Sequence, residues 1–161
     1  LYIGIYKLYQ KKWQKMFKLH KNILTKKEQK HLLNFIETKL KYFGEEWPGL
    51  QTENNLHTYK ELEPFLKKIK KHIEPNTVKD CWANYTEGDY ITWHKHDSKY
   101  SVIYYLKNKK EIGVMFKKSK YGIEYTKGPE NSLLIFDGSR IHSMPNTYEK
   151  IKRYTIALDI I

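Results

Sequence analysis

The sequence contains one cysteine, Cys81, among 161 residues, which excludes a disulfide framework within the chain. A chain without disulfides suits a reducing compartment, so we expect a cytoplasmic location. No apolar run is long enough to cross a bilayer. The apolar start at Leu1–Tyr6 is short, is soon followed by lysines and lacks the order of regions of a signal peptide. These absences leave a soluble globular protein as the expected class.

Arginine is also scarce: of the 30 basic residues, only Arg140 and Arg153 are arginines. A net charge of +12 suggests nucleic acid as a partner, yet arginine is the residue preferred for bidentate contacts with phosphates and bases. The charge is also uneven, because residues 1–40 carry ten lysines against Glu28 and Glu37. We therefore interpret the charge as a solvated, lysine-rich composition and keep nucleic acid or an acidic protein as the alternative partner.

Two hydrophobic periods divide the chain, which we interpret as a single domain over residues 1–161. Up to about residue 75 the spacing is helical, with a capping box at Thr25 and Glu28 and a second helix predicted over 61–73. From Val78 the period becomes two, which predicts short strands over 78–85, 90–94, 101–107, 112–117, 121–126, 132–136, 141–144 and 152–160. The predicted fold is mainly β (α+β): a double-stranded β-helix, or jelly roll, over 78–161, with the helices of residues 1–75 packed on one sheet.

Two histidines two residues apart, His94 and His96, lie in a run that reads as β-strand. Successive strand side chains point to opposite faces, so these imidazoles share a face and can chelate one metal ion. His142, on a later predicted strand, can supply a third ligand. Imidazole suits iron, copper, nickel and zinc, and three ligands on one face of an octahedron leave positions open for substrates. The spacing therefore predicts a three-ligand metal site of the non-haem iron type.

Arg153 lies eleven residues after His142, inside the last predicted strand. An arginine that points into an apolar barrel needs a carboxylate partner. The predicted pocket supplies no obvious one at that depth, and a bound dicarboxylate would serve.

Three blocks of the sequence together resemble the iron(II)- and 2-oxoglutarate-dependent dioxygenases. The resemblance is to the prolyl-hydroxylase branch and to small oxygenases of bacteria and their phages, and it covers about half of the chain. The blocks are Asn84–His94, Ser101–Leu106, and Ser132–Asn146 followed by Arg153-Tyr-Thr155. The resemblance implies His94 and His142 as iron ligands, and Arg153, Thr155, Tyr105 and Tyr85 as contacts of 2-oxoglutarate. It implies an enzyme that uses Fe(II), 2-oxoglutarate and O2 to hydroxylate a C–H bond of a peptide or small molecule in a bacterial or phage-infected cell, with release of succinate and CO2.

One departure from the family's commoner His-x-Asp pattern leaves the second ligand open, because the chain has His94-Lys95-His96. His96 can ligate and give a neutral three-histidine site, a bulge at Lys95 can bring Asp97 onto the metal, or the site binds no iron.

Two other functions compete with the oxygenase. One is a basic jelly-roll module without redox activity that binds nucleic acid or an acidic protein, and the other is a cupin-like metalloprotein that needs no 2-oxoglutarate.

The remaining candidates have less context. We expect substrate specificity to come from loops at the barrel mouth, over residues 45–55 and 117–120, and we expect Trp82 in the pocket wall or the core. Arg140 is placed near the pocket mouth, facing an acidic substrate or solvent. The histidines without a motif are expected on the surface: His20, His31, His57 and His72.

Overall fold

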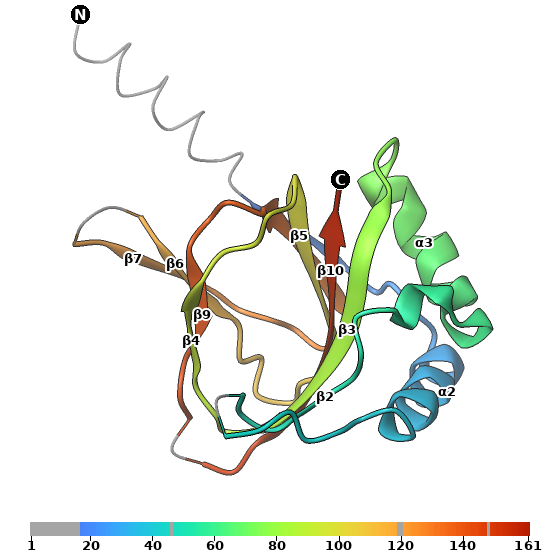
Figure 1. Cartoon of the computed structure of the whole chain (residues 1–161), viewed down its shortest axis with the longest axis horizontal. Helices are drawn as coiled ribbons and strands as arrows, with labels where there is room; N and C mark the ends of the chain where they lie inside the picture. The colour runs from blue at the N-terminus through green and yellow to red at the C-terminus, as the bar shows by residue number, and fades with distance from the viewer. Residues whose placement is uncertain (1–16, 46, 119–120, 148) are drawn as a thin grey trace, which may run out of the picture.

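A computed structural model describes residues 17–45, 47–118, 121–147 and 149–161 (Figure 1). The segment Leu1–Met16, with the expectation drawn from Leu1–Tyr6, lies outside them, as does part of the predicted 117–120 loop. The described elements follow in the order β1 (Phe17–Lys21), α2 (Lys26–Glu37), β2 (Leu50–Gln51), η1 (Leu56–Thr58), η2 (Lys60–Leu62), α3 (Glu63–Ile73), β3 (Val78–Glu87), β4 (Ile91–His94), β5 (Tyr100–Lys107), β6 (Val114–Lys117), β7 (Ile123–Thr126), β8 (Ser132–Asp137), β9 (His142–Met144) and β10 (Lys152–Ile160).

These strands form two antiparallel sheets. The larger has the order β1-β8-β5-β10-β3-β2, and the smaller has the order β4-β9-β6-β7. In Figure 1, α2 and α3 lie on the outer side of the sheet that holds β3 and β10, while β4 and β9 lie across from it. The predicted mainly β jelly roll with helices packed on one sheet is confirmed. No helix in the described part of the chain is both long and apolar enough to cross a bilayer.

Alternation along β10 explains why one sheet has two different faces. Tyr154, Ile156 and Leu158 belong to the apolar core that also contains Ile36 of α2 and Ile69 of α3. The residues between them point to the opposite face, toward the smaller sheet. The helices therefore seal one face of the larger sheet and leave the other to line a cavity.

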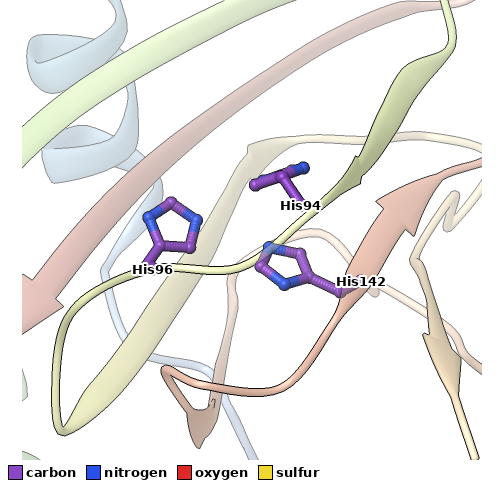
Figure 2. A group of neighbouring side chains, drawn as sticks. All are labelled: His94, His96 and His142. Atoms are coloured by element: carbon purple, nitrogen blue, oxygen red, sulfur yellow. The ribbon is translucent and has the colours of Figure 1, made fainter.

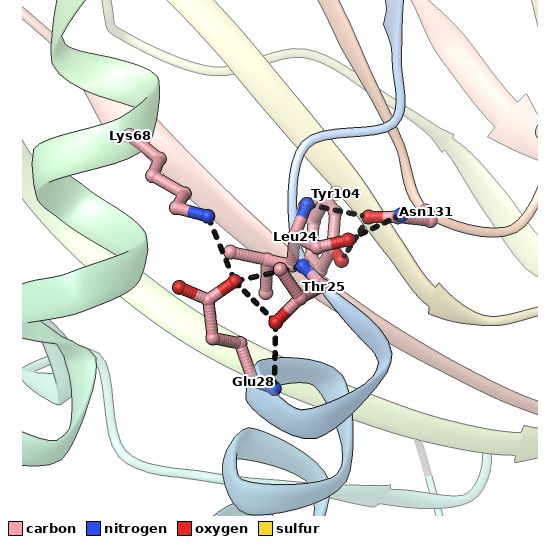
Figure 3. A network of polar contacts seen from close by, with 6 residues as sticks. All are labelled: Leu24, Thr25, Glu28, Lys68, Tyr104 and Asn131. Atoms are coloured by element: carbon pink, nitrogen blue, oxygen red, sulfur yellow. Dashed lines mark hydrogen bonds and ion pairs between the residues drawn. The ribbon is translucent and has the colours of Figure 1, made fainter.

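The start of α2 is tied to both the sheet and α3 (Figure 3). The predicted capping box is present: the Thr25 hydroxyl accepts from the Glu28 backbone N–H at 3.3 Å, and the Glu28 carboxylate accepts from the Thr25 N–H at 2.7 Å. Lys68 Nζ of α3 donates to the same carboxylate at 2.8 Å. These hydrogen bonds, from Lys68 first, lower the pKa of Glu28 to about 2. Asn131, at the start of β8, bonds both backbone groups of Leu24 and so fixes the helix entry to the sheet.

The first 75 residues also contribute two strands that the helical pattern does not predict. β1 pairs with β8 from Phe17↔Phe136 to Lys21↔Ser132, and β2 pairs with β3. Both strands lie at the edges of the larger sheet. The segment before residue 75 is therefore part of the jelly roll as well as its helical support.

Candidate metal centre

A cavity of about 470 Å³ lies between the two sheets. Its lining includes His94, His96 and His142, together with Arg153 and Thr155 of β10. The structure thus brings the three predicted metal ligands and two of the predicted co-substrate contacts into one space.

The three histidines meet at the rim of the smaller sheet (Figure 2). His94 ends β4, His142 begins β9, and the two are paired in the ladder between these strands. His96 lies two residues beyond the end of β4, so its position depends on the following loop rather than on strand alternation. One ring nitrogen from each residue forms a group whose members all lie within 4.8 Å of one another.

Hydrogen bonds fix the orientation of all three imidazoles. The Nδ1 atoms contact the Thr92 carbonyl oxygen at 2.7 Å (His94), an Asp159 carboxylate oxygen at 3.2 Å (His96) and the Arg140 carbonyl oxygen at 2.9 Å (His142). Carbonyl and carboxylate oxygens only accept, so each Nδ1 carries the proton and each Nε2 offers a lone pair. Metal-binding histidines almost always have such an outer partner.

Burial favours the neutral form of the His94 and His142 imidazoles, which is the form that binds metals. It lowers the pKa of His142 to about 3, against a smaller opposing effect of the Arg140 carbonyl. Burial also lowers the pKa of His94, against the opposing effect of the Thr92 carbonyl. No proton has to leave either ring near neutral pH when a cation enters.

Asp159 of β10 is a site residue that the sequence analysis missed. Its carboxylate accepts from His96 and, at 3.1 Å each, from the hydroxyls of Ser98 and Ser101. Burial alone would raise the pKa of Asp159, but these hydrogen bonds outweigh burial and the pKa lies below its ordinary value. The sequence did hold a signal for this residue, the alternation of side chains along the strand. Asp159 is an even number of positions from Arg153 and Thr155 and so shares the cavity-facing side of β10 with them.

Asp97, the alternative metal ligand, is not in the group. Its side chain is exposed and does not line the cavity, whereas the His96 backbone N–H donates to the Gly138 carbonyl at 2.9 Å. That bond anchors the loop with the imidazole directed inward. The alternative with Asp97 on the metal is therefore wrong for this structure.

Arg153 is 4% exposed and has no carboxylate partner among the described residues. One Nη contacts the sulfur of Met144, and the guanidinium carbon lies 5.5 Å from the ring centre of Tyr105. The Nε atom and the Tyr105 hydroxyl are buried without a hydrogen-bond partner in the described part of the chain. A thioether and an aromatic ring leave a buried guanidinium electrostatically unsatisfied. Met144 is two residues beyond His142. The unpartnered guanidinium that contacts it therefore lies about 7 Å along β9 from a metal ligand.

The donor set therefore fits both groups that the resemblance implies. Three neutral imidazoles on one side of the cavity suit a divalent iron. A small dicarboxylate can reach from that metal to Arg153 and supply the missing anionic partner, since charge-assisted pairs of this kind are the strong ones.

Tyr85 does not lie in the site. Asn84 lines the cavity, and Tyr85, the next residue on β3, points to the helix side, where its ring packs 4.7 Å from that of Tyr154. Its hydroxyl donates to Glu87. The predicted contact of Tyr85 with 2-oxoglutarate is wrong because strand alternation turns it away.

Two further expectations need correction. Arg140 faces neither substrate nor solvent, because it is buried, pairs with Glu124 at 2.6 Å and stacks 4.1 Å over the Phe116 ring. His20 of β1 and His72 of α3 are partly buried and face each other, with ring centres 3.9 Å apart. Trp82 lines the cavity, as predicted.

Comparisons with known proteins agree with this geometry at the level of the fold. No family model matches the chain, and no curated protein does. Among solved structures, a prolyl hydroxylase from Trichoplax adhaerens, in complex with a peptide fragment of hypoxia inducible factor, matches with a TM-score of 0.63 at 12% identity, covering 90% of this chain and 83% of that one. HygX from Streptomyces hygroscopicus, with nickel and 2-oxoglutarate bound, matches with a TM-score of 0.70 at 9% identity, covering 89% and 82%. The α-ketoglutarate-dependent epimerase SnoN matches with a TM-score of 0.72 at 7% identity, covering 90% and 77%.

The fold is that of the 2-oxoglutarate- and iron(II)-dependent oxygenases. Within that fold, this chain carries a three-histidine group that can hold a metal ion. The neighbours include hydroxylases and an epimerase, so the fold alone does not fix the reaction.

Proposed function

We propose that this protein is an Fe(II)- and 2-oxoglutarate-dependent dioxygenase that hydroxylates a C–H bond of a peptide or small-molecule substrate. The proposal rests on one observation: two groups of residues that each lack a ligand, a set of histidines and a buried arginine, line the same cavity. Three imidazoles each place a ring nitrogen within 4.8 Å of the others, and a buried arginine that lines the same cavity has no anionic partner in the described chain.

Each residue has a distinct task in this proposal. His94, His96 and His142 hold the iron, and Arg153 pairs with the distal carboxylate of 2-oxoglutarate. Thr155 and Tyr105 offer hydroxyls near that carboxylate. The iron and 2-oxoglutarate, when bound, supply the activation of O2 and the oxidising power, and succinate and CO2 are released. The protein contributes orientation and a dry, shaped cavity.

The ligand set is neutral, so charge balance comes from outside it. The Asp159 carboxylate accepts from Nδ1 of His96, the ring nitrogen that is turned away from the proposed metal. This arrangement raises the basicity of the imidazole without using a coordination position. We propose that Asp159 thereby replaces part of the charge that a carboxylate ligand provides in the commoner pattern.

The alternative, a basic binding module without redox activity, explains less. It leaves the three oriented imidazoles and the unpartnered Arg153 without a purpose, and both are costly to bury. Cys81 is free and buried, which supports the proposed cytoplasmic location.

Uncoupled turnover tests the proposal without knowledge of the substrate. We expect the protein, incubated in air with Fe(II) and labelled 2-oxoglutarate, to release labelled succinate slowly, and His142→Ala to lose this release. His72→Ala, which removes a histidine far along the chain from the site, is the matched control and should retain it. A wild type that releases no succinate above a metal-free control, or a His142→Ala variant that releases as much as the wild type, would contradict the proposal.

A further inference from the structure

The cavity has a second end, away from Arg153, whose lining differs in charge and shape. The inference drawn from it rests on the proposed function, because it concerns the substrate of the same site. Three paired strands of the larger sheet, β5, β10 and β3, form the wall. Their register places side chains in three rungs: Tyr105, Thr155 and Asn84; then Ile103, Ala157 and Trp82; then Ser101, Asp159 and Asp80.

The third rung is acidic and lies beside the metal centre. Asp80 of β3 is directly opposite Asp159 of β10 in the ladder, and Asp159 bonds His96. Successive rungs are about 7 Å apart, so this acidic end is well separated from Arg153 beyond the first rung.

Asp80 differs from Asp159 in having no partner. The Asp159 carboxylate is occupied by His96, Ser98 and Ser101, while Asp80 lines the cavity with no hydrogen bond or ion pair to any described residue. Lys79, its neighbour on β3, points away and donates to the Asp97 carbonyl.

The absence of lysine from this lining is informative, because lysine is so common elsewhere. The chain has 28 lysines, yet none of the described ones lines the cavity. Apart from the histidines and Arg153, the charged groups of the lining are the two carboxylates, Asp80 and Asp159. The acidic end of the cavity therefore has no internal cation to neutralise it.

An aromatic ring completes this end of the cavity. Trp82 lies in the second rung, next to the acidic one, and its ring stacks 5.6 Å from that of His96. Carboxylates and aromatic faces both favour a cation that carries N–H donors.

We propose that the substrate presents an amine, as an ammonium ion, to Asp80 and the aromatic ring of Trp82. The ammonium then lies on the metal side of the cavity, near the C–H bond that is oxidised, while the 2-oxoglutarate carboxylate occupies the opposite, arginine end. The two ligands are sorted by charge: the anion goes to Arg153, and the cation goes to Asp80. An acidic or uncharged substrate would leave Asp80 unpaired, because Arg153 lies at the opposite end of the cavity and pairs there with 2-oxoglutarate.

A set of three probes of equal length tests this sorting: n-hexylammonium, 1-hexanol and hexanoate. The protein is loaded with Ni(II) and 2-oxoglutarate to prevent turnover, and binding is followed by tryptophan fluorescence and by saturation-transfer NMR. We expect hexylammonium to bind at least about tenfold more tightly than either other probe. Asp80→Asn should remove this preference, Asp80→Glu should retain it, and Asp97→Asn, an exposed carboxylate outside the cavity, should leave it unchanged.

Equal binding of hexanol or hexanoate by the wild type overturns the inference, and so does an ammonium preference that survives in Asp80→Asn. Circular dichroism and bound nickel establish that each variant is folded. Binding of 2-oxoglutarate is measured separately, with Arg153→Ala as its reference. A wild type that binds 2-oxoglutarate normally but shows no ammonium preference refutes the substrate class alone, while a wild type that fails to bind 2-oxoglutarate refutes the proposed function.

Discussion

The molecule contains two histidine clusters that look alike by distance and differ in everything around them. His94, His96 and His142 meet between the sheets, and each Nδ1 contacts a carbonyl or carboxylate oxygen. His20 and His72 approach to 3.9 Å between ring centres on the outer side, in a groove lined by Lys21, Lys67, Lys68 and Lys71. Among the described contacts, no carbonyl or carboxylate oxygen accepts a hydrogen bond from either of these two rings.

The difference shows that closeness of imidazoles is not enough to define a metal site. A ligand needs a fixed tautomer, a lone pair that points into space, and surroundings that do not repel a cation. The first cluster meets all three conditions. The second lies in a lysine-lined groove, and burial first, then neighbouring positive charges including that of Lys71, lower the pKa of both rings. The comparison predicts that only the first cluster binds divalent metal.

The largest expected effect comes from removing one member of each cluster. His142→Ala should weaken Fe(II) or Ni(II) binding by more than about 100-fold, because loss of an outer partner alone costs 10–100-fold. His72→Ala should leave the affinity unchanged. Calorimetric titration of the metal-free protein measures both, and a metal affinity that depends on His72 would break the comparison.

The two arginines provide the next contrast. Arg153→Ala should cost about 2–5 kcal/mol of 2-oxoglutarate binding, or roughly thirtyfold or more in affinity, because it removes a buried charge-assisted contact. Arg140 is already paired with Glu124, so Arg140→Ala should lower stability and leave 2-oxoglutarate affinity intact. Equilibrium binding of labelled 2-oxoglutarate to the Ni(II)-loaded protein separates these outcomes, and equal losses in both variants would contradict the assignment.

A smaller effect is expected at the outer shell of the metal centre. Asp159→Asn should weaken metal binding by about 10–100-fold, because His96 loses the carboxylate that orients it. Asp80→Asn changes the carboxylate opposite in the same rung, which bonds no histidine, and metal affinity should not respond. Were Asp159→Asn to bind metal as tightly as the wild type, the outer carboxylate would have no role in holding the site.

The smallest effect concerns the pH dependence of stability in the metal-free protein. The pKa of His142 in the folded state is about 3, below its ordinary unfolded value of about 6.5. Its contribution is fully present above pH 6.5 and is lost as the pH falls from there toward 3, since only the unfolded state then gains the proton. The loss is at most about 1.4 kcal/mol per pH unit. Urea unfolding between pH 7.5 and 5 should show a shallower decline for His142→Gln than for the wild type, and parallel curves would contradict the burial argument.

The fold and most of the site could be predicted because their signals are periodic or local. The change to period two at Val78 located β3 to β10 within a few residues, and the capping box at Thr25 located α2. The histidine and arginine spacing selected four residues that do line one cavity. Alternation also explains why the predicted contact of Tyr85 with 2-oxoglutarate was wrong, because a sequence match does not say which of two neighbouring positions faces inward.

The remainder depends on contacts between distant segments. β2 has two residues and cannot show a period, and the alternation of β1 is only five residues long within a lysine-rich region. His96 lies past the end of β4, so its inward direction depends on the bond to Gly138 from another loop. Strand alternation places Asp159 on the same face as Arg153 and Thr155, but its role at the metal centre depends on the contact with His96, 63 positions away, which alternation alone does not reveal.

One spectrum tests the central claim most directly: the visible absorption of the protein with Fe(II) and 2-oxoglutarate under anaerobic conditions. Chelation of the ferrous ion by the keto acid should give a weak charge-transfer band that requires both components. We predict that His142→Ala lacks the band and that Arg153→Ala needs more 2-oxoglutarate to develop it. A wild-type protein without the band, or a His142→Ala variant that keeps it, would contradict the claim that these imidazoles and Arg153 form one site.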